Sequence, residues 1–262
     1  MTSAPFTLLL VAATDTELSP LRVRLDDDAA AHGHAPGVAF RYLVTGVGPV
    51  ATATALTEEL LRHPVDLVFD IGLAGALDAS LPLRHVALVT SETLGDLGAE
   101  DRDGRHLDLF TLGLLDRDAA PFSGGKLLGL PRAPIPTAHP HRARLERLVA
   151  TLARHLPSAD EYLAGTTVSR AHGSAAGIAA FRERNDAALE SMEGAAVFYA
   201  ALRQNTPCLQ LRAVSNHVVP RDRDAWDVPG ALDRLTARAS DILGDFRRGV
   251  RDAPYAPPPR SR

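Results

Sequence analysis

The chain has 262 residues, of which 45% are hydrophobic and 23% charged, and its formal net charge is −4. This composition is typical of a globular protein with a sizeable core. The acidic balance and the 5% aromatic content argue against a nucleic-acid-binding surface, which needs basic side chains and stacking rings. The single cysteine, Cys208, excludes an intrachain disulfide and a cysteine-based zinc site.

The apolar run nearest the start covers residues 8–13, far short of the ~20 residues that span a bilayer. Thr14-Asp15-Thr16-Glu17 follows it, where a signal peptide would carry small residues before its cleavage site. We therefore expect a cytoplasmic protein without membrane contact.

Short apolar runs bounded by turn residues predict strands, and apolar residues three or four apart predict helices. In chain order we expect a strand over residues 6–13, a helix over 15–25, a strand over 38–45, a helix over 49–61 and strands over 65–71 and 86–93. A helix over 142–155, a strand over 162–168, helices over 175–184 and 193–204, a strand over 208–214 and a helix over 229–247 follow. Residues 26–37 and 117–140 are expected to be loops, and 252–262 a disordered tail.

Strands that alternate with helices predict a mostly parallel sheet covered on both faces, here as a single α/β domain over residues 6–248. Ligands of such sheets bind beyond the carboxyl ends of the strands. Those ends carry the unusual residues of this chain, at positions 14–17, 46–48, 72–75, 168–169, 192–193 and 215–216.

Glu17 has two interpretations. Thr14 followed three residues later by Glu17 is the pattern of a capping box at a helix start. A carboxylate at a strand–helix junction is equally suited to act as a general base. The spacing alone does not decide between them.

Gly46-Val47-Gly48 followed by Ala51 fits a dinucleotide-binding pattern between a strand and a helix, which would imply a nicotinamide cofactor. Pro49 removes an N–H from the helix start that would face a pyrophosphate, so we favour a tight turn that needs glycine. Taken singly, Glu193 is a favourable charge at a helix N-terminus and Asn216 a turn residue.

Taken together, four segments resemble the purine nucleoside phosphorylase and nucleosidase superfamily, in particular its 5′-methylthioadenosine/S-adenosylhomocysteine nucleosidase branch. They are LLVAATDTELSPLR at 9–22, TGVGPVATA at 45–53, DIGLAGALDASL at 70–81 and SMEGAA at 191–196. The resemblance implies a three-layer α/β fold with a central mixed sheet and helices on both faces. It also implies a homo-oligomer, dimer or larger, that acts on a small-molecule nucleoside without metal or organic cofactor.

The resemblance also implies site residues. Glu17 matches the water-activating glutamate, Gly75 a backbone position beside the substrate, and Met192 and Glu193 the pair that packs on the nucleoside and holds its ribose hydroxyls. Val168, at the end of the strand predicted over residues 162–168, is a further candidate for substrate binding.

Two departures from the family pattern concern the substrate and the nucleophile. Asn216 stands where the methylthioadenosine enzymes carry a purine-protonating aspartate, and an amide suits the O6 and N7–H of a 6-oxopurine such as hypoxanthine or guanine. Asp70 and Leu73 stand where hexameric phosphorylases hold phosphate with arginine and serine, so we expect water as the nucleophile.

This combination resembles the futalosine hydrolase family of the futalosine route to menaquinone, which releases hypoxanthine and dehypoxanthine futalosine. LGDLGAED at 94–101 and RAVSNHVVPRDRDAW at 212–226 are also similar to that family. Arg221 or Arg223 is a candidate for the carboxylate on the carboxyphenyl group of futalosine. Three alternatives stay open: an adenine-directed nucleosidase for methylthioadenosine, S-adenosylhomocysteine or aminodeoxyfutalosine, an NAD-dependent oxidoreductase, and a nucleoside-binding module without turnover.

Overall fold

The computed structural model describes residues 5–32 and 37–251, so the tail predicted over 252–262 lies outside the described residues. The strands are β1 (Phe6–Ala12), β2 (Val38–Val44), β3 (Leu67–Ala76), β4 (Val86–Leu94), β5 (Gly98–Glu100), β6 (His106–Asp108), β7 (Leu127–Leu128), β8 (Tyr162–Thr167), β9 (Leu189–Ser191) and β10 (Cys208–His217). The helices are α1 (Asp15–His32), α2 (Pro49–Arg62), α3 (Arg142–His155), α4 (Ala175–Arg184), α5 (Gly194–Arg203) and α6 (Val228–Arg251), with a 3-10 turn over Ala159–Glu161.

The main sheet is mixed, because β1, β2 and β3 run parallel while β10 pairs antiparallel with β4, and β3 antiparallel with β9. Part of the sheet closes on itself, because neighbouring strands pair in the order β3, β10, β4, β8, β9 and β9 pairs again with β3. β10 occupies one edge of β3 from Val68 to Ala76. The other edge is therefore shared by β1, up to Asp70, and β9, from Gly75.

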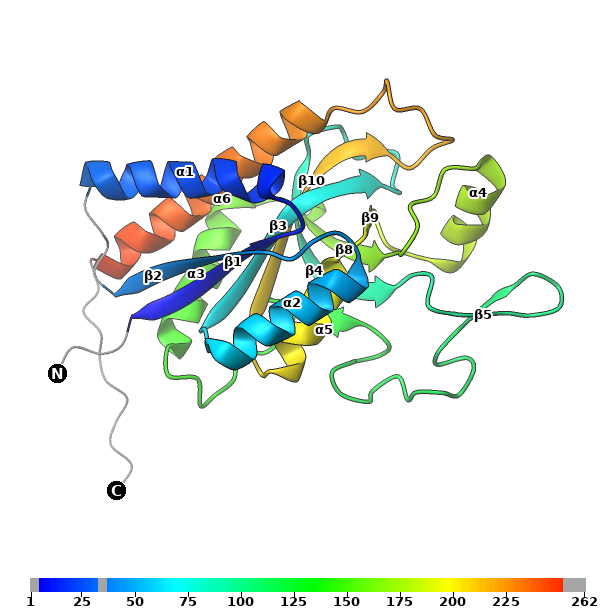
Figure 1. Cartoon of the computed structure of the whole chain (residues 1–262), viewed down its shortest axis with the longest axis horizontal. Coiled ribbons are helices and arrows are strands. Elements are labelled where there is room, and N and C mark those ends of the chain that lie inside the picture. Colours follow the sequence, from blue (N-terminus) through cyan, green and yellow to red (C-terminus); the bar gives the residue numbers. More distant parts are fainter. Residues whose placement is uncertain (1–4, 33–36, 252–262) are drawn as a thin grey trace.

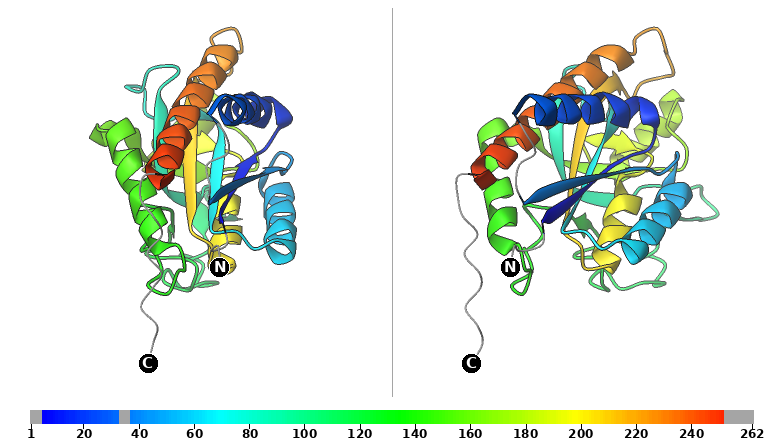
Figure 2. Two further views of the ribbon diagram at one scale, coloured as in Figure 1. Left: turned by 90° about the vertical axis from the view of Figure 1, so that its left-hand side faces the viewer. Right: turned by 60° about the vertical axis from the view of Figure 1, so that its left-hand side comes forward.

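Helices cover both faces of this sheet (Figure 1). Figure 2 shows α3 and α2 on opposite sides of the strands. One apolar cluster joins β1, β3 and β10 to α1, α3 and α6, and a second joins the other face of the same strands to α2 and α5. The predicted fold class is thus confirmed. Within the part of the chain that the structure describes, no helix has the length and apolarity needed to cross a membrane.

Helix α1 continues to His32, so the loop predicted from residue 26 is wrong in its first part. The acidic run Asp26-Asp27-Asp28 suggested a loop, but tertiary contacts stabilise the last turns. Leu25 is buried, and Arg247 of α6 binds both Asp28 Oδ2 at 2.9 Å and the Leu25 carbonyl at 3.5 Å.

Strand β9 has only three residues and was not predicted. Strands β3 and β10 also extend beyond their predicted ends, to Ala76 and His217. These extensions pair with each other and β3 pairs with β9, so they depend on partners that are distant in the sequence.

Candidate active site

The candidate site lies where β1 leaves the edge of β3 at Asp70 and β9 joins the same edge at Gly75. Between these points the edge of β3 has no strand partner, and side chains from other elements reach it. The backbone N–H of Leu73 donates to Glu17 Oε1 at 3.2 Å. A strand edge that changes partner in this way is the place where α/β sheets bind ligands.

Glu17 is fixed by the first turn of α1. Its Oε2 accepts from Thr14 N at 3.0 Å and from Thr14 Oγ1 at 2.7 Å, while Glu17 N donates to Thr14 Oγ1 at 3.4 Å. This is the predicted capping box. The other carboxylate oxygen faces β3, so one conformer of Glu17 both caps the helix and lies in the candidate site.

Glu193 occupies the N-cap position of α5 and is buried, but its side chain does not bond to the N–H groups of the helix. Its Oε1 accepts from the backbone N–H of Gly48 at 2.9 Å. Gly46 and Gly48 have φ of 84° and 92°, a region that glycine adopts without strain. Because Gly48 donates its N–H to a carboxylate, the turn binds a side chain of this protein, and the dinucleotide-binding interpretation loses its main phosphate donor.

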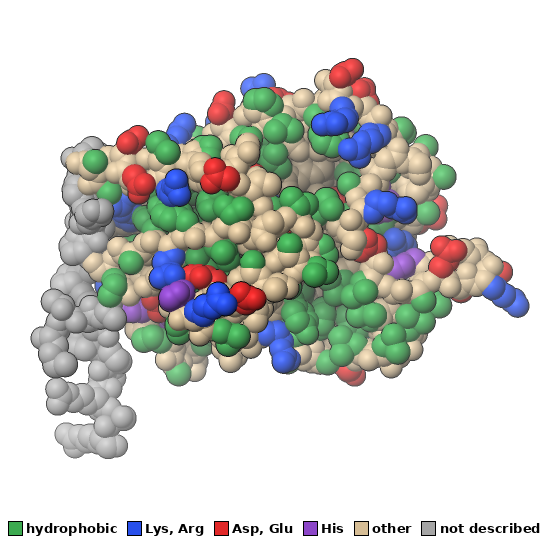
Figure 3. All heavy atoms as spheres, viewed as in Figure 1, with side chains coloured by type: hydrophobic (Ala, Val, Ile, Leu, Met, Phe, Trp, Pro, Cys, Tyr) green, Lys and Arg blue, Asp and Glu red, His purple; other side chains and the backbone are tan. Residues whose placement is uncertain are grey.

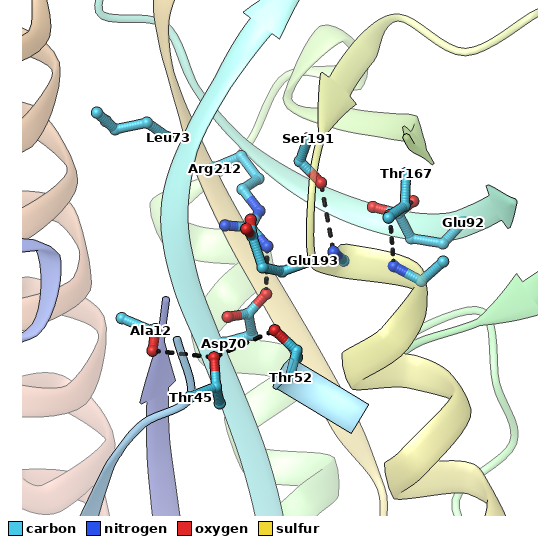
Figure 4. Close-up of polar contacts among 12 residues, drawn as sticks. Ala12, Thr45, Thr52, Asp70, Leu73, Glu92, Thr167, Ser191, Glu193 and Arg212 are labelled. Carbon is cyan, nitrogen blue, oxygen red and sulfur yellow. Dashed lines mark hydrogen bonds and ion pairs between the residues drawn. The ribbon is translucent and has the colours of Figure 1, made fainter. Parts of the chain in front are cut away.

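A buried ion pair between Arg212 and Asp70 lies next to Glu193 (Figure 4). Arg212 Nη2 donates to Asp70 Oδ2 at 2.6 Å, and both side chains are almost fully buried. Burial raises the pKa of Asp70 to about 7, although Arg212 pulls that pKa down. Burial by itself lowers the pKa of Arg212, but Asp70, Glu193 and Glu17 together raise it, so the guanidinium stays charged.

Gly72 makes room for this ion pair, since a Cβ there would overlap Arg212 Nη1. Sequence reasoning noted Asp70 but missed Arg212. The available signal was an arginine inside a predicted strand of mainly apolar residues.

Glu92 of β4 is a second buried carboxylate that sequence reasoning missed. Thr167 Oγ1 donates to Glu92 Oε2 at 3.1 Å, and the same hydroxyl accepts from Ala195 N at 2.7 Å (Figure 4). Burial raises the pKa of Glu92 to about 8, against the opposing effects of Arg212, Thr167 and Gln210. Burial therefore favours the protonated form of this carboxyl group.

Asn216 and Gly75 are direct partners between β10 and β3, just after a bulge in β10. Asn216 Nδ2 donates to the His217 carbonyl at 3.1 Å, and Oδ1 accepts from Ser215 Oγ at 2.8 Å. One N–H and one oxygen lone pair of the amide stay available. A Cβ on Gly75 would lie 3.2 Å from Asn216 Nδ2 and 2.8 Å from Val218 Cγ2, so the glycine lets both side chains pack closely against β3.

The other predicted residues lie around this centre. Met192 is half-buried and directly precedes Glu193. Val168 is fully buried in a small apolar cluster with Phe181 and Val218. Arg221 and Arg223 instead lie against the ring of Trp226, with guanidinium carbons 5.4 and 5.9 Å from its centroid.

Comparisons with known proteins identify the family of this chain. A profile of the phosphorylase superfamily matches residues 12–247. A futalosine hydrolase of Streptomyces coelicolor is 40% identical over 200 residues, which cover 74% of each chain. A futalosine hydrolase of Thermus thermophilus is 30% identical over 209 residues, which cover 80% of this chain and 83% of that relative.

Solved structures share the fold at low sequence identity. A 5′-methylthioadenosine/S-adenosylhomocysteine nucleosidase from Colwellia psychrerythraea, in complex with adenine, superposes with a TM-score of 0.70 at 18% identity and covers 94% of this chain and 98% of its own. The native futalosine hydrolase of Helicobacter pylori has a TM-score of 0.68 at 14% identity, with 91% and 97% covered.

Proposed function

This chain belongs to the phosphorylase superfamily, and from that premise we propose that it hydrolyses the N-glycosidic bond of futalosine and releases hypoxanthine. Futalosine is the substrate named for relatives that match most of this chain. The observation that carries the reaction type is the grouping of Glu17 and Glu193 around the buried Asp70–Arg212 pair.

Glu17 is the general base of the proposed reaction. Its Oε2 is engaged by Thr14, whereas Oε1 has a single donor, the Leu73 N–H at 3.2 Å. A carboxylate oxygen has lone pairs for more than one donor, so Oε1 can also accept a proton from water that attacks C1′ of the ribose.

Water is the nucleophile because the cation of this cluster, among the residues that the structure describes, already has a carboxylate partner. Arg212 is the cation of this cluster, and Asp70 binds it at 2.6 Å in a buried pair. A phosphate dianion would have to compete with Asp70 and would lie near Glu17 and Glu193. Like charges in so buried a place repel strongly.

Glu193 and Met192 hold the ribose. Glu193 Oε1 binds Gly48, which fixes the carboxylate over the sheet and leaves acceptor capacity for sugar hydroxyls. Negative charge from Glu193 and Glu17 stabilises the positive charge that develops on the sugar in an oxocarbenium-like transition state. Asn216 receives the departing base through its remaining N–H and lone pair. The apolar cluster of Val168 and Val218, which packs against Gly75, offers an apolar surface beside it.

The test is to incubate the purified protein with futalosine, inosine and methylthioadenosine, with and without phosphate, and to separate free bases by chromatography. We expect hypoxanthine from futalosine at a rate that phosphate does not change. Adenine from methylthioadenosine as the faster product would overturn the substrate in favour of an adenine-directed nucleosidase. If no free base is released from any of the three nucleosides, the protein is a nucleoside-binding module without turnover.

We also propose that the enzyme is a homo-oligomer built on an apolar surface formed by α2, α5 and the segment after β4. Exposed hydrophobic side chains gather there (Figure 3), including Val50 at 80% exposure together with Val47, Leu97 and Tyr199. The surface begins at the Gly48 turn that binds Glu193. Light scattering should give at least a dimer, and Val50→Asp should shift it towards monomer.

A further inference from the structure

A histidine–glutamate pair lies at the same edge of the sheet as Asn216, on the other side of Gly75. Gly75 pairs with Asn216 of β10 on one edge and with Glu190 of β9 on the other. Directly paired residues on neighbouring strands point to the same face. Asn216 and Glu190 therefore flank Gly75 at two strand spacings, roughly 10 Å apart. The space that a side chain at position 75 would take is filled by Val218, which belongs to the same apolar cluster as Phe181.

Glu190 is buried and holds His172 in two ways. Its Oε2 binds His172 Nδ1 at 2.5 Å, and its Oε1 accepts from the backbone N–H of His172 at 3.2 Å. The imidazole also packs on Phe181, with ring centroids 4.1 Å apart. Neither the ribose-binding nor the water-activating role described above uses this pair.

The loop that carries His172 is itself tied down at both ends. Ser169 N donates to Asp96 Oδ2 at 2.6 Å, and the Gly173 carbonyl accepts from Arg221 N at 3.0 Å. The second contact joins this loop to the segment that follows Asn216. The position of His172 against Glu190 and Phe181 is therefore fixed from several sides.

The carboxylate of Glu190 accepts a hydrogen bond only, so it selects the imidazole tautomer with hydrogen on Nδ1 and leaves Nε2 as an acceptor. A 6-oxopurine carries a hydrogen on N1, whereas the N1 of adenine is a lone pair. We propose that His172, oriented by Glu190, accepts the N1–H of hypoxanthine and is a second specificity-determining residue beside Asn216. This inference rests on the proposed function, and it names the residue that reads the far edge of the base.

Glu190→Gln tests the tautomer directly. The amide that this substitution introduces keeps its oxygen towards the His172 backbone N–H, so its NH₂ faces Nδ1 and donates to it. Hydrogen then moves to Nε2, which becomes a donor that suits adenine and opposes the N1–H of hypoxanthine. One mismatched buried hydrogen bond corresponds to about tenfold to a hundredfold in affinity.

The measurement is calorimetric titration of free hypoxanthine and free adenine, which needs no turnover. We expect Glu190→Gln to weaken the binding of hypoxanthine and strengthen the binding of adenine. The ratio of the two dissociation constants should change by about tenfold or more. Asp96→Ala is the matched control, because it loosens the same loop without changing the tautomer. It should weaken both bases alike.

Equal weakening of both bases by Glu190→Gln would make the pair a structural tie and overturn the inference, as would failure of the wild type to bind hypoxanthine. If Glu190→Gln does not fold, His172→Phe replaces it, since it keeps the ring contact with Phe181 but has no acceptor. This variant should weaken the binding of hypoxanthine and leave the binding of adenine unchanged. A changed ratio in a protein that does not cleave futalosine would sustain the inference and refute the proposed function.

Discussion

Glu17→Gln separates catalysis from helix capping. In the native protein Oε2 accepts two hydrogen bonds from Thr14, and Oε1 accepts one from Leu73 N. The glutamine carbonyl oxygen can replace Oε2, but its NH₂ then faces the N–H of Leu73, which costs ~1–3 kcal/mol of stability. Glu17 is only partly buried, so we expect the lower end of that range.

The expected loss of activity is larger. Removal of a general base costs ~10²–10⁴ in rate, which is roughly 3–5 kcal/mol of transition-state stabilisation. The assay is the initial rate of hypoxanthine release at saturating futalosine, with a melting curve and hypoxanthine binding measured on the same preparation. Binding of the base should change little, because Glu17 faces the ribose side of the site.

Thr14→Ala is the matched control. It removes both Thr14 hydroxyl contacts of the capping box and costs ~0.5–2 kcal/mol of stability, yet it keeps the carboxylate, so its rate should stay within about tenfold of the wild type. The reasoning would be refuted if Thr14→Ala lost as much activity as Glu17→Gln, or if Glu17→Gln turned over almost normally. In either case Glu17 would be a helix cap only.

Asn216→Asp should lower kcat/KM for futalosine and raise the relative kcat/KM for its 6-amino analogue, and an unchanged ratio of the two would show that Asn216 does not contact the base. Cleavage should be independent of phosphate because Asp70 engages Arg212, so a sugar 1-phosphate among the products would contradict the hydrolytic mechanism. The pKa of Glu92 is raised from 4.5 to about 8, so the native state holds this proton more tightly than the unfolded chain and the free energy of unfolding should fall as pH rises across that interval. Glu92→Gln, which resembles the protonated form, should flatten this decline in denaturant titrations across the same interval, and an equally steep decline would show that Glu92 is not its source.

The elements with strong local signals could be predicted from the sequence. The apolar run of β1 predicted a buried strand, and Pro49 and the amphipathic pattern predicted α2 and α3 at nearly their observed bounds. Sequence patterns also put Glu17, Glu193 and Asn216 next to predicted strand or helix ends. These features depend on residues within a few positions of one another, which is the range over which propensity and periodicity act.

The contacts that assemble the candidate site join residues that are far apart in the sequence. Asp70 meets Arg212 across 142 positions, Gly48 meets Glu193 across 145, and Glu17 meets Leu73 across 56. The three-residue strand β9, too short to give a periodic signal, is held by pairing with β8 on one side and with the edge of β3 beyond β1 on the other. Local sequence determined which residues stand at the strand ends. Only the tertiary structure decided which of them meet, because strand pairing joins segments whose separation along the chain no local pattern encodes.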